Sequence, residues 1–145
     1  MKKIEPTSAH PLAILLVDDE AIVRKTIGDY LTELGHRVQQ VSDGASALQW
    51  LEKQDYDIAL VDMRMPGMDG LALLQKVREI YPELSVVIIT AHGNMEMAIQ
   101  ALRLGAADFL TKPIKLLELD AVLEKSMQLL KLRQEGRHLR ETIRG

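Results

Sequence analysis

Five polar side chains of the types used in phosphoryl chemistry stand at or just beyond the ends of short apolar runs. They are the adjacent carboxylates Asp18 and Asp19, the carboxylate Asp62, the hydroxyl of Thr90 and the ammonium of Lys112. Carboxylates that crowd together repel one another, and burial without partners raises their pKa values and destabilises the fold. A divalent cation offsets that repulsion, and oxygen ligands without His or Cys suit Mg²⁺, which also takes phosphate oxygens. The set predicts a Mg²⁺-dependent site that handles a phosphoryl group.

The individual side chains have expected parts in that chemistry. Asp62 is the expected nucleophile, because the metal would screen an incoming phosphoryl group from the carboxylate that attacks it. Lys112 would offer a cation, and Thr90 a hydroxyl, to the phosphoryl oxygens, so that charge in the transition state meets fixed donors. Taken singly, any of these residues could be a solvated loop residue, and Asp18 or Asp19 could cap a helix. The chemistry needs all five in one place.

Five apolar runs predict the strands that would bring these residues together. Three runs are continuously apolar, which indicates strands buried on both faces, and two are weaker. The stronger runs are residues 13–17, 58–61 and 86–89, and the weaker ones are 37–41 and 108–110. The segments between them have helical spacing, with stop signals at Gly35, Pro82 and Gly105. This alternation predicts an α/β fold with a doubly wound five-stranded parallel sheet, flavodoxin-like, whose ligands bind at the carboxyl ends of the strands.

The last segment, from Leu116 to about Arg144, is roughly twice the usual helix length. Its second part carries a short heptad seam of apolar and small residues, namely Leu129, Leu132, Gly136, Leu139 and Ile143. We expect a leader over residues 1–12, one domain over 13–127 and a helical extension or linker over 128–145. Two such extensions could form a parallel coiled coil, which predicts a homodimer through the final helix and its extension. A solvated tail is the alternative.

Composition narrows the class of protein. The 145 residues are 47% hydrophobic and 27% charged, as in one soluble globular domain, and the lack of cysteine excludes disulfides and thiol nucleophiles. No run is long enough for a signal peptide or a membrane span, so we expect a cytoplasmic protein without membrane contact. The net charge of −3 gives no cationic field towards nucleic acid, and one final helix cannot form a helix-turn-helix. Direct specific DNA binding is therefore not expected.

Four stretches of sequence carry a resemblance to a known family. The segments ILLVDDE, VDMRMPGMDG, VIITAHG and AADFLTKPI resemble, in order and spacing, the signature segments of response-regulator receiver domains, from about Ala13 to about Met127. The resemblance implies a two-component phosphorelay in which Asp62 accepts a phosphoryl group from a sensor histidine kinase. The change would then pass to an output domain or a downstream protein. Such a domain catalyses only its own phosphorylation and dephosphorylation and is otherwise not an enzyme.

The resemblance also implies a metal-binding role for particular residues. Asp18 and Asp19 match the acidic pair that binds Mg²⁺, and Asp62 matches the phosphorylation site, which is also a metal ligand. Arg64 matches the residue whose backbone carbonyl binds the metal. Arg64 and His92 occupy positions that in the family tune how long the phosphoryl group survives.

Further matches concern phosphate contact and switching. Thr90 and Lys112 match the phosphate-contacting pair, and Thr90 is also the first half of the family's conformational switch. Phe109 falls at the second switch position, where the family often has Tyr, so any signal that needs that hydroxyl is lost. Lys112 and Pro113 match a Lys-Pro step that is often a cis peptide. The histidines outside the signature segments, His10, His36 and His138, are expected to be ordinary surface residues.

Other functions remain as alternatives. A haloacid-dehalogenase-like phosphatase also uses an aspartyl phosphate, but it needs a second Asp two residues after the nucleophile, where this chain has Arg64. A dinucleotide-binding domain would need a G-x-G-x-x-G motif after the first strand. The segment DMRMPGMDG and the heptad tail resemble receivers joined to ATPase-type transcription activators. Other outputs, or a free-standing receiver that acts in a phosphorelay or as a protein-binding module, stay open.

Overall fold

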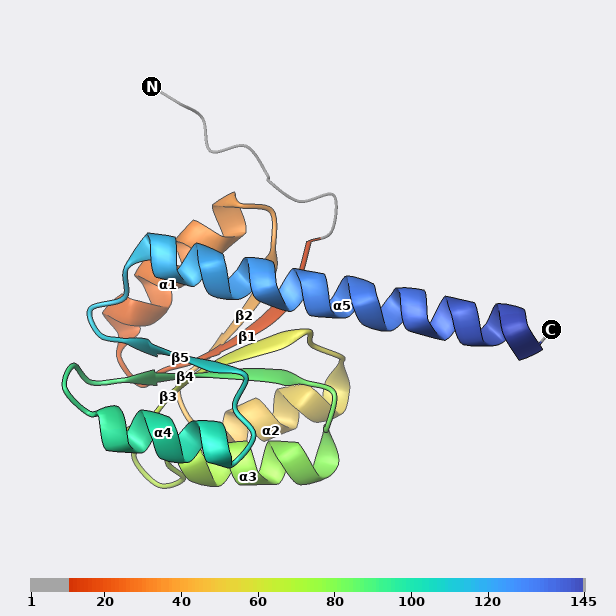
Figure 1. Ribbon diagram of the computed structural model, residues 1–145. Coiled ribbons are helices and arrows are strands. Elements are labelled where there is room, and N and C mark those ends of the chain that lie inside the picture. The colour runs from red at the N-terminus through yellow and green to blue at the C-terminus, as the bar shows by residue number, and fades with distance from the viewer. Residues whose placement is uncertain (1–10, 145) are drawn as a thin grey trace.

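The computed structural model describes residues 11–144, and side chains are described for residues 11–136. Five parallel strands form one sheet in the order β2-β1-β3-β4-β5 (Figure 1). The strands are β1 (Ala13–Val17), β2 (Arg37–Val41), β3 (Ile58–Asp62), β4 (Ser85–Thr90) and β5 (Asp108–Thr111). The helices are α1 (Ala21–Glu33), α2 (Gly44–Lys53), α3 (Gly70–Ile80), α4 (Met95–Arg103) and α5 (Leu116–Arg144). The predicted doubly wound α/β fold is confirmed.

Helices cover both faces of the sheet, as Figure 1 shows, with α1 and α5 on one side and α2, α3 and α4 on the other. Successive side chains of β1 point to opposite faces of the sheet. Ile14 and Leu16 belong to the apolar cluster under α1 and α5, whereas Leu15 and Val17 belong to the cluster on the other face. Every residue of β1 and β3 is buried, which accounts for the continuous apolar runs 13–17 and 58–61. The edge strand β2 is mostly half-buried or exposed, and its sequence is correspondingly mixed.

The strand order reverses at β1, which has β2 on one side and β3 on the other. A doubly wound sheet opens a crevice at such a switch point, beyond the carboxyl ends of the strands. The residues that follow β1 and end β3 therefore line that crevice. The predicted stop signals work as expected at Gly35 and Gly105, where positive φ angles of 96° and 107° turn the chain out of α1 and α4.

The expectation for His36 is wrong. Its side chain is only 5% exposed, because the turn between α1 and β2 lies close to α5, and a small cavity there is lined by His36, Asp120 and Leu123. The Nδ1 atom of His36 accepts a hydrogen bond from the backbone N–H of Leu12 at 2.9 Å. Burial lowers the pKa of His36, which favours the neutral ring that this contact requires. His10 and the side chain of His138 lie outside the described part of the chain.

Helix α5 runs across the sheet and continues beyond the body of the domain (Figure 1). Its early turns close the core through Leu119 and Leu123, which are buried. Contacts with the body continue past Met127: Leu130 packs against the core, and Arg133 donates a hydrogen bond to the backbone carbonyl of Glu83 at 2.8 Å. Among the described residues, no helix is both long enough and apolar enough to cross a membrane.

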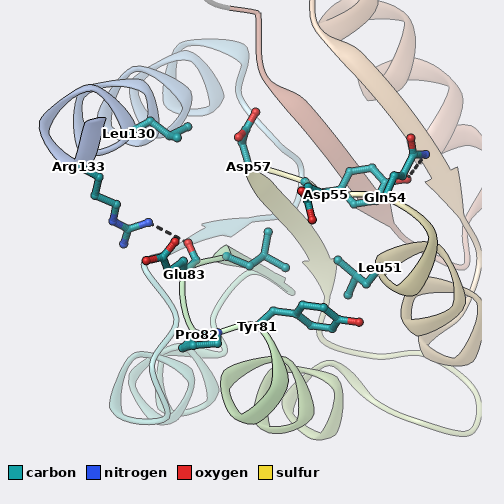
Figure 2. Close-up of a pocket in the computed structure, with 11 residues that line it drawn as sticks. Leu51, Gln54, Asp55, Asp57, Tyr81, Pro82, Glu83, Leu130 and Arg133 are labelled. Atoms are coloured by element: carbon teal, nitrogen blue, oxygen red, sulfur yellow. Dashed lines mark hydrogen bonds between the residues drawn. The ribbon is translucent and has the colours of Figure 1, made fainter. Parts of the chain in front are cut away.

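A hollow of about 440 Å³ lies beneath this part of α5, at the amino ends of β3 and β4 (Figure 2). Arg133 and Leu130 face it from α5, with Asp57 and Tyr81 among the residues on its other walls. Asp57 already uses its carboxylate to accept a hydrogen bond from the backbone N–H of Ala13 at 2.8 Å. Because it lies at the amino ends of the strands, the hollow is at the opposite edge of the sheet from Asp62 and Thr90, which end β3 and β4.

Candidate functional site

The carboxyl ends of four strands bring the five predicted polar side chains together. Asp18 follows β1, Asp62 ends β3, Thr90 ends β4 and Lys112 follows β5. Carboxylate oxygens of Asp18, Asp19 and Asp62 lie with one oxygen of Glu20 within 4.8 Å of one another. Asp18 and Asp62 are buried, whereas Asp19 and Glu20 are exposed at the rim. The sheet thus gathers three acidic residues from one strand end with a fourth from its neighbour.

Lys112 spans the acidic groups from the opposite side. Its Nζ atom lies 3.4 Å from Oδ2 of Asp18 and 3.5 Å from Oδ2 of Asp62. Its shortest contact, 2.6 Å, is with Oε1 of Glu20. Burial alone would lower the pKa of Lys112, but the hydrogen bond to Glu20 and the charges of Asp18 and Asp62 outweigh it and raise that pKa. The lysine is therefore a fixed cation at this site.

Asp18 organises the start of α1, but neither Asp18 nor Asp19, the two possible caps named from the sequence, occupies the N-cap position. The N-cap position is Glu20, whose side chain makes no capping hydrogen bond. Asp18 instead uses Oδ1 to accept a hydrogen bond from the backbone N–H of Glu20 at 2.9 Å. Arg24 donates a hydrogen bond to the backbone carbonyl of Asp18 at 2.7 Å. Sequence reasoning singled out neither Glu20 nor Arg24 for such contacts; for Glu20 the available signal was its place directly after the acidic pair.

The loop after Asp62 needs glycine at two places. Gly67 has a positive φ of 79°, a backbone conformation that favours glycine. At Gly70, a Cβ atom would lie 2.6 Å from the backbone oxygen of Asp62, so only glycine lets α3 begin this close to the end of β3. The backbone N–H of Arg64 points to Oδ1 of Asp62 at 3.4 Å, and the Arg64 side chain is exposed. The loop is thereby held against the carboxylate.

Asp62 sits in an environment that disfavours its charge. Burial, and next the charge of Asp18, raise the pKa of Asp62 to about 6, against the opposing attraction of Lys112. The side chain of Asp62 is 7% exposed, so solvent relieves little of this repulsion. A cation bound among the carboxylates would remove the repulsion that the lysine does not offset.

Two buried polar atoms at the site lack a hydrogen-bond partner within the described part of the chain: Oδ2 of Asp18 and Oγ1 of Thr90. Buried polar groups are normally satisfied, so each atom is suited to a further partner, although the Lys112 ammonium lies 3.4 Å from Oδ2 of Asp18. A carboxylate oxygen suits a hard cation such as Mg²⁺, and a hydroxyl can donate to a phosphoryl oxygen. The residues present therefore fit both a magnesium ion and a phosphoryl group.

Thr90 and Phe109 lie on the neighbouring strands β4 and β5. In the register of that pair Phe109 stands opposite Ile88, and Thr90 stands opposite Thr111. Phe109 is half-buried, whereas Thr90 is buried. The backbone N–H of Lys112 donates to the carbonyl of Thr90 at 2.8 Å, and the following Lys112–Pro113 peptide is cis, the isomer that the family resemblance implies.

Comparison with known proteins agrees with this arrangement. The family model of the response regulator receiver domain matches residues 14–124. The regulatory protein AtoC of Escherichia coli (strain K12) is 35% identical over 130 residues, which cover 90% of this chain and 28% of AtoC. The C4-dicarboxylate transport transcriptional regulatory protein DctD of Rhizobium meliloti (strain 1021) is 36% identical over 133 residues, which cover 92% of this chain and 29% of DctD.

The solved receiver domain of NtrX from Brucella abortus superposes with a TM-score of 0.76 at 38% identity, covering 79% of this chain and 98% of that one. The chain thus spans less than a third of the length of AtoC and DctD but nearly all of a solved receiver domain. With the family model matching residues 14–124, this chain belongs to the response-regulator receiver domains of two-component signalling.

Proposed function

We propose that Asp62 is the phosphoacceptor of this receiver domain and that its phosphorylation depends on Mg²⁺. The observation that carries the proposal is the convergence on Asp62 of the acidic pair, the Lys112 ammonium and an unpaired Thr90 hydroxyl. In the reaction, one carboxylate oxygen of Asp62 forms a bond to phosphorus. The bond from phosphorus to the donor's leaving atom breaks, and the leaving group keeps that electron pair.

The residues around Asp62 would bind the metal ion and the phosphoryl oxygens. Asp18, Asp19 and Asp62, with the backbone carbonyl of Arg64, would hold Mg²⁺, which supplies positive charge to the phosphoryl oxygens. Lys112 meets another phosphoryl oxygen with its ammonium, and Thr90 donates its hydroxyl. Because Thr90 ends β4 and Lys112 follows β5, the strand ends present both donors at the edge of the sheet where charge would develop.

Uptake of phosphate by the whole chain tests the proposal. Incubation with acetyl phosphate and Mg²⁺ is expected to add one phosphoryl group per chain, measured by intact-protein mass spectrometry. The adduct should be lost in alkaline hydroxylamine, as an acyl phosphate is. A chain that takes up no phosphate, or takes it up in a hydroxylamine-resistant form, would contradict the assignment.

Thr90 and Phe109 are proposed to pass the change to the surface formed by α4, β5 and α5. A phosphoryl group on Asp62 offers oxygen acceptors to the Thr90 hydroxyl, and movement of Thr90 would leave room for Phe109 to turn inward. Phosphorylation then shifts an equilibrium between two existing arrangements. The exposed apolar side chains of α4, including Met95, Ile99 and Leu102, would be the part of that surface that contacts a partner.

Thr90→Ala is expected to uncouple this response from phosphorylation. The variant should still be phosphorylated, within roughly tenfold of the normal rate, because Asp62, the acidic pair and Lys112 remain. The amide chemical-shift changes over α4 and β5 should fall by about half or more, because a hydroxyl that draws inward is missing. Thr90→Ser keeps the hydroxyl and should keep the response. Equal shifts in Thr90→Ala and the wild type would contradict the switch.

The partners follow from the same proposal. A sensor histidine kinase would supply the phosphoryl group, and the receiver would act in the cytoplasm on an output domain or a downstream protein. The chain would catalyse only its own phosphorylation and dephosphorylation. The relatives AtoC and DctD are much longer regulators, which supports a receiver that regulates transcription through a further domain. We propose no membrane contact and no direct specific DNA contact by this part of the protein.

The α5 extension is proposed to pair with that of a second copy. Leu129 and Leu132, the first two apolar positions of the heptad seam, are 39% and 63% exposed, while Leu130 faces the core. The side chains of Leu139 and Ile143, which would complete the seam, lie outside the described residues. A seam of about two heptads is marginal alone, so pairing would need support from the domain faces next to it.

Sedimentation tests this pairing. The full chain is expected to dimerise. The double variant Leu129→Asn/Leu132→Asn and a chain ending at Met127 should weaken the dimer by roughly tenfold or more, because each chain loses two leucines that the dimer would bury. Leu117→Asn is the matched control, since Leu117 is 84% exposed on the same helix but outside the seam. If each of the four chains sediments as a monomer, with and without phosphodonor, the extension is a solvated helix and the proposed pairing is wrong.

A further inference from the structure

Of the acidic side chains that contact Lys112, Glu20 makes the shortest contact. The Nζ atom of Lys112 is 2.6 Å from Glu20 but 3.4 Å from Asp18 and 3.5 Å from Asp62. The ammonium therefore rests closest to the most exposed of its three acidic partners, since the Glu20 side chain is 53% exposed. In the resting structure the lysine thus makes a closer contact with the carboxylate at the rim than with Asp62, which lies 3.5 Å away.

The backbone around Glu20 is fixed by hydrogen bonds to Asp18 and to the first turn of α1. The N–H of Glu20 donates to Oδ1 of Asp18 at 2.9 Å, and its carbonyl accepts the N–H of Arg24 at 3.1 Å as α1 begins. The Glu20 side chain makes no capping hydrogen bond, so it is free to reach across to the β5–α5 turn. Lys112 is itself positioned by its backbone N–H bond to Thr90 at 2.8 Å. The two side chains are thus presented to each other by separate rigid elements.

We propose that Glu20 is a positioning residue that holds the Lys112 ammonium at the rim of the unphosphorylated site and must release it when Asp62 is phosphorylated. This inference rests on the proposed roles of Asp62 and Lys112. Lys112 exchanges a carboxylate partner for a phosphoryl oxygen during the reaction, so the Glu20 contact stabilises the unphosphorylated state relative to the phosphorylated one. Glu20 thereby sets how readily this receiver is phosphorylated.

Glu20 could instead be a fourth metal ligand, since its oxygen lies within the acidic cluster. The geometry favours the lysine: Mg²⁺ usually takes only one or two carboxylates, and Asp18, Asp19 and Asp62 already provide three. Oδ2 of Asp18 makes no hydrogen bond among the described residues and has the Lys112 ammonium only at 3.4 Å, whereas Oε1 of Glu20 is hydrogen-bonded to that ammonium at 2.6 Å. A metal titration separates these two roles.

Glu20→Gln in the full chain tests the inference. The variant keeps the size of the side chain but weakens its hold on Lys112, so phosphorylation by acetyl phosphate at saturating Mg²⁺ should become roughly threefold to tenfold faster; the effect is modest because Glu20 is half exposed. Affinity for beryllofluoride, which occupies the place of a phosphoryl group on a carboxylate without any turnover, should rise by a similar factor. Glu33→Gln, at the far end of α1, removes the same charge and should change neither value.

Lys112→Met shows whether Glu20 acts through the lysine. In a double-mutant cycle, the beryllofluoride effect of Glu20→Gln should shrink to less than about twofold when Lys112 is already Met. An effect that persists in full would mean that Glu20 acts by charge repulsion alone, and would overturn the inference. So would a loss of Mg²⁺ affinity as large as that in Asp19→Asn, because Glu20 would then be a metal ligand.

The outcomes also separate this inference from the proposed function. If the wild type is not phosphorylated at Asp62, the proposed function fails. If the wild type is phosphorylated and Glu20→Gln behaves like the wild type in rate and in beryllofluoride affinity, only the role of Glu20 fails.

Discussion

Removal of free Mg²⁺ with a chelator is expected to slow phosphorylation of this receiver by at least roughly a hundredfold. Asp18, Asp19 and Asp62 bring their carboxylates within a few ångströms, and the single ammonium of Lys112 does not offset all of their charge. A phosphodonor adds further negative charge to this cluster. Without a divalent cation the donor is repelled by the group that must attack it, so the rate falls steeply.

The substitution Asp19→Asn tests the same dependence on Mg²⁺ by weakening a metal ligand instead of removing the metal. We expect the variant to need at least about tenfold more Mg²⁺ to reach half its maximal rate, because one metal ligand is weakened. Asp29→Asn is the control, since Asp29 is exposed on α1 and pairs only with Lys25 in the described structure. Initial rates of acetyl phosphate consumption at a series of Mg²⁺ concentrations measure both. Phosphorylation that runs equally fast in a chelator would rule out the proposed metal site.

Asp62→Asn is expected to stabilise the metal-free fold at neutral pH by about 1–3 kcal/mol. The pKa of Asp62 is raised to about 6 in the folded chain, chiefly by burial and then by Asp18, from an ordinary value of 3.8. A raised acid pKa means that the folded chain binds the proton more tightly than the unfolded chain. The stability that the neutral carboxyl contributes is complete below about pH 4 and is lost as the pH rises through about 6.

Asn carries no charge, so the variant escapes that loss. Urea unfolding of both chains in a chelator at about pH 7.5 measures the difference, which should vanish below about pH 4 because the wild-type carboxyl is then neutral in both states. Asp55→Asn, an exposed carboxylate far from the site, should change stability by less than about 0.5 kcal/mol. A wild type that is as stable as Asp62→Asn at both pH values would mean that Asp62 is not under electrostatic strain.

The sheet and the main site were predictable because both depend on short-range patterns. The apolar runs of β1, β3 and β4 have few alternatives to buried parallel strands, and the ends of parallel strands meet at one edge. Asp62 and Lys112 could therefore be brought together from sequence although they are far apart in the chain. Only the strand order is needed to bring these two residues to the same edge of the sheet.

Other features depend on tertiary contacts that no local pattern encodes. His36 is buried because α5 crosses the turn that carries it, and Leu12 supplies the donor for its ring. On α4 the buried residues are the small Ala98 and Ala101, whereas the larger Met95 and Leu102 are exposed. Glu20 stands beside the acidic pair in sequence, but only the position of the β5–α5 turn decides that it meets Lys112.

The most direct test of the central claim is the identity of the phosphorylated residue. The chain is treated with acetyl phosphate and Mg²⁺, the acyl phosphate is reduced with borohydride, and peptides are sequenced by mass spectrometry. Reduction of an aspartyl phosphate leaves homoserine, which marks the position permanently. We expect homoserine at position 62 alone. Homoserine at Asp18 or Asp19, or a phosphoryl group that remains on His92 while Asp62 is unmodified, would contradict the account.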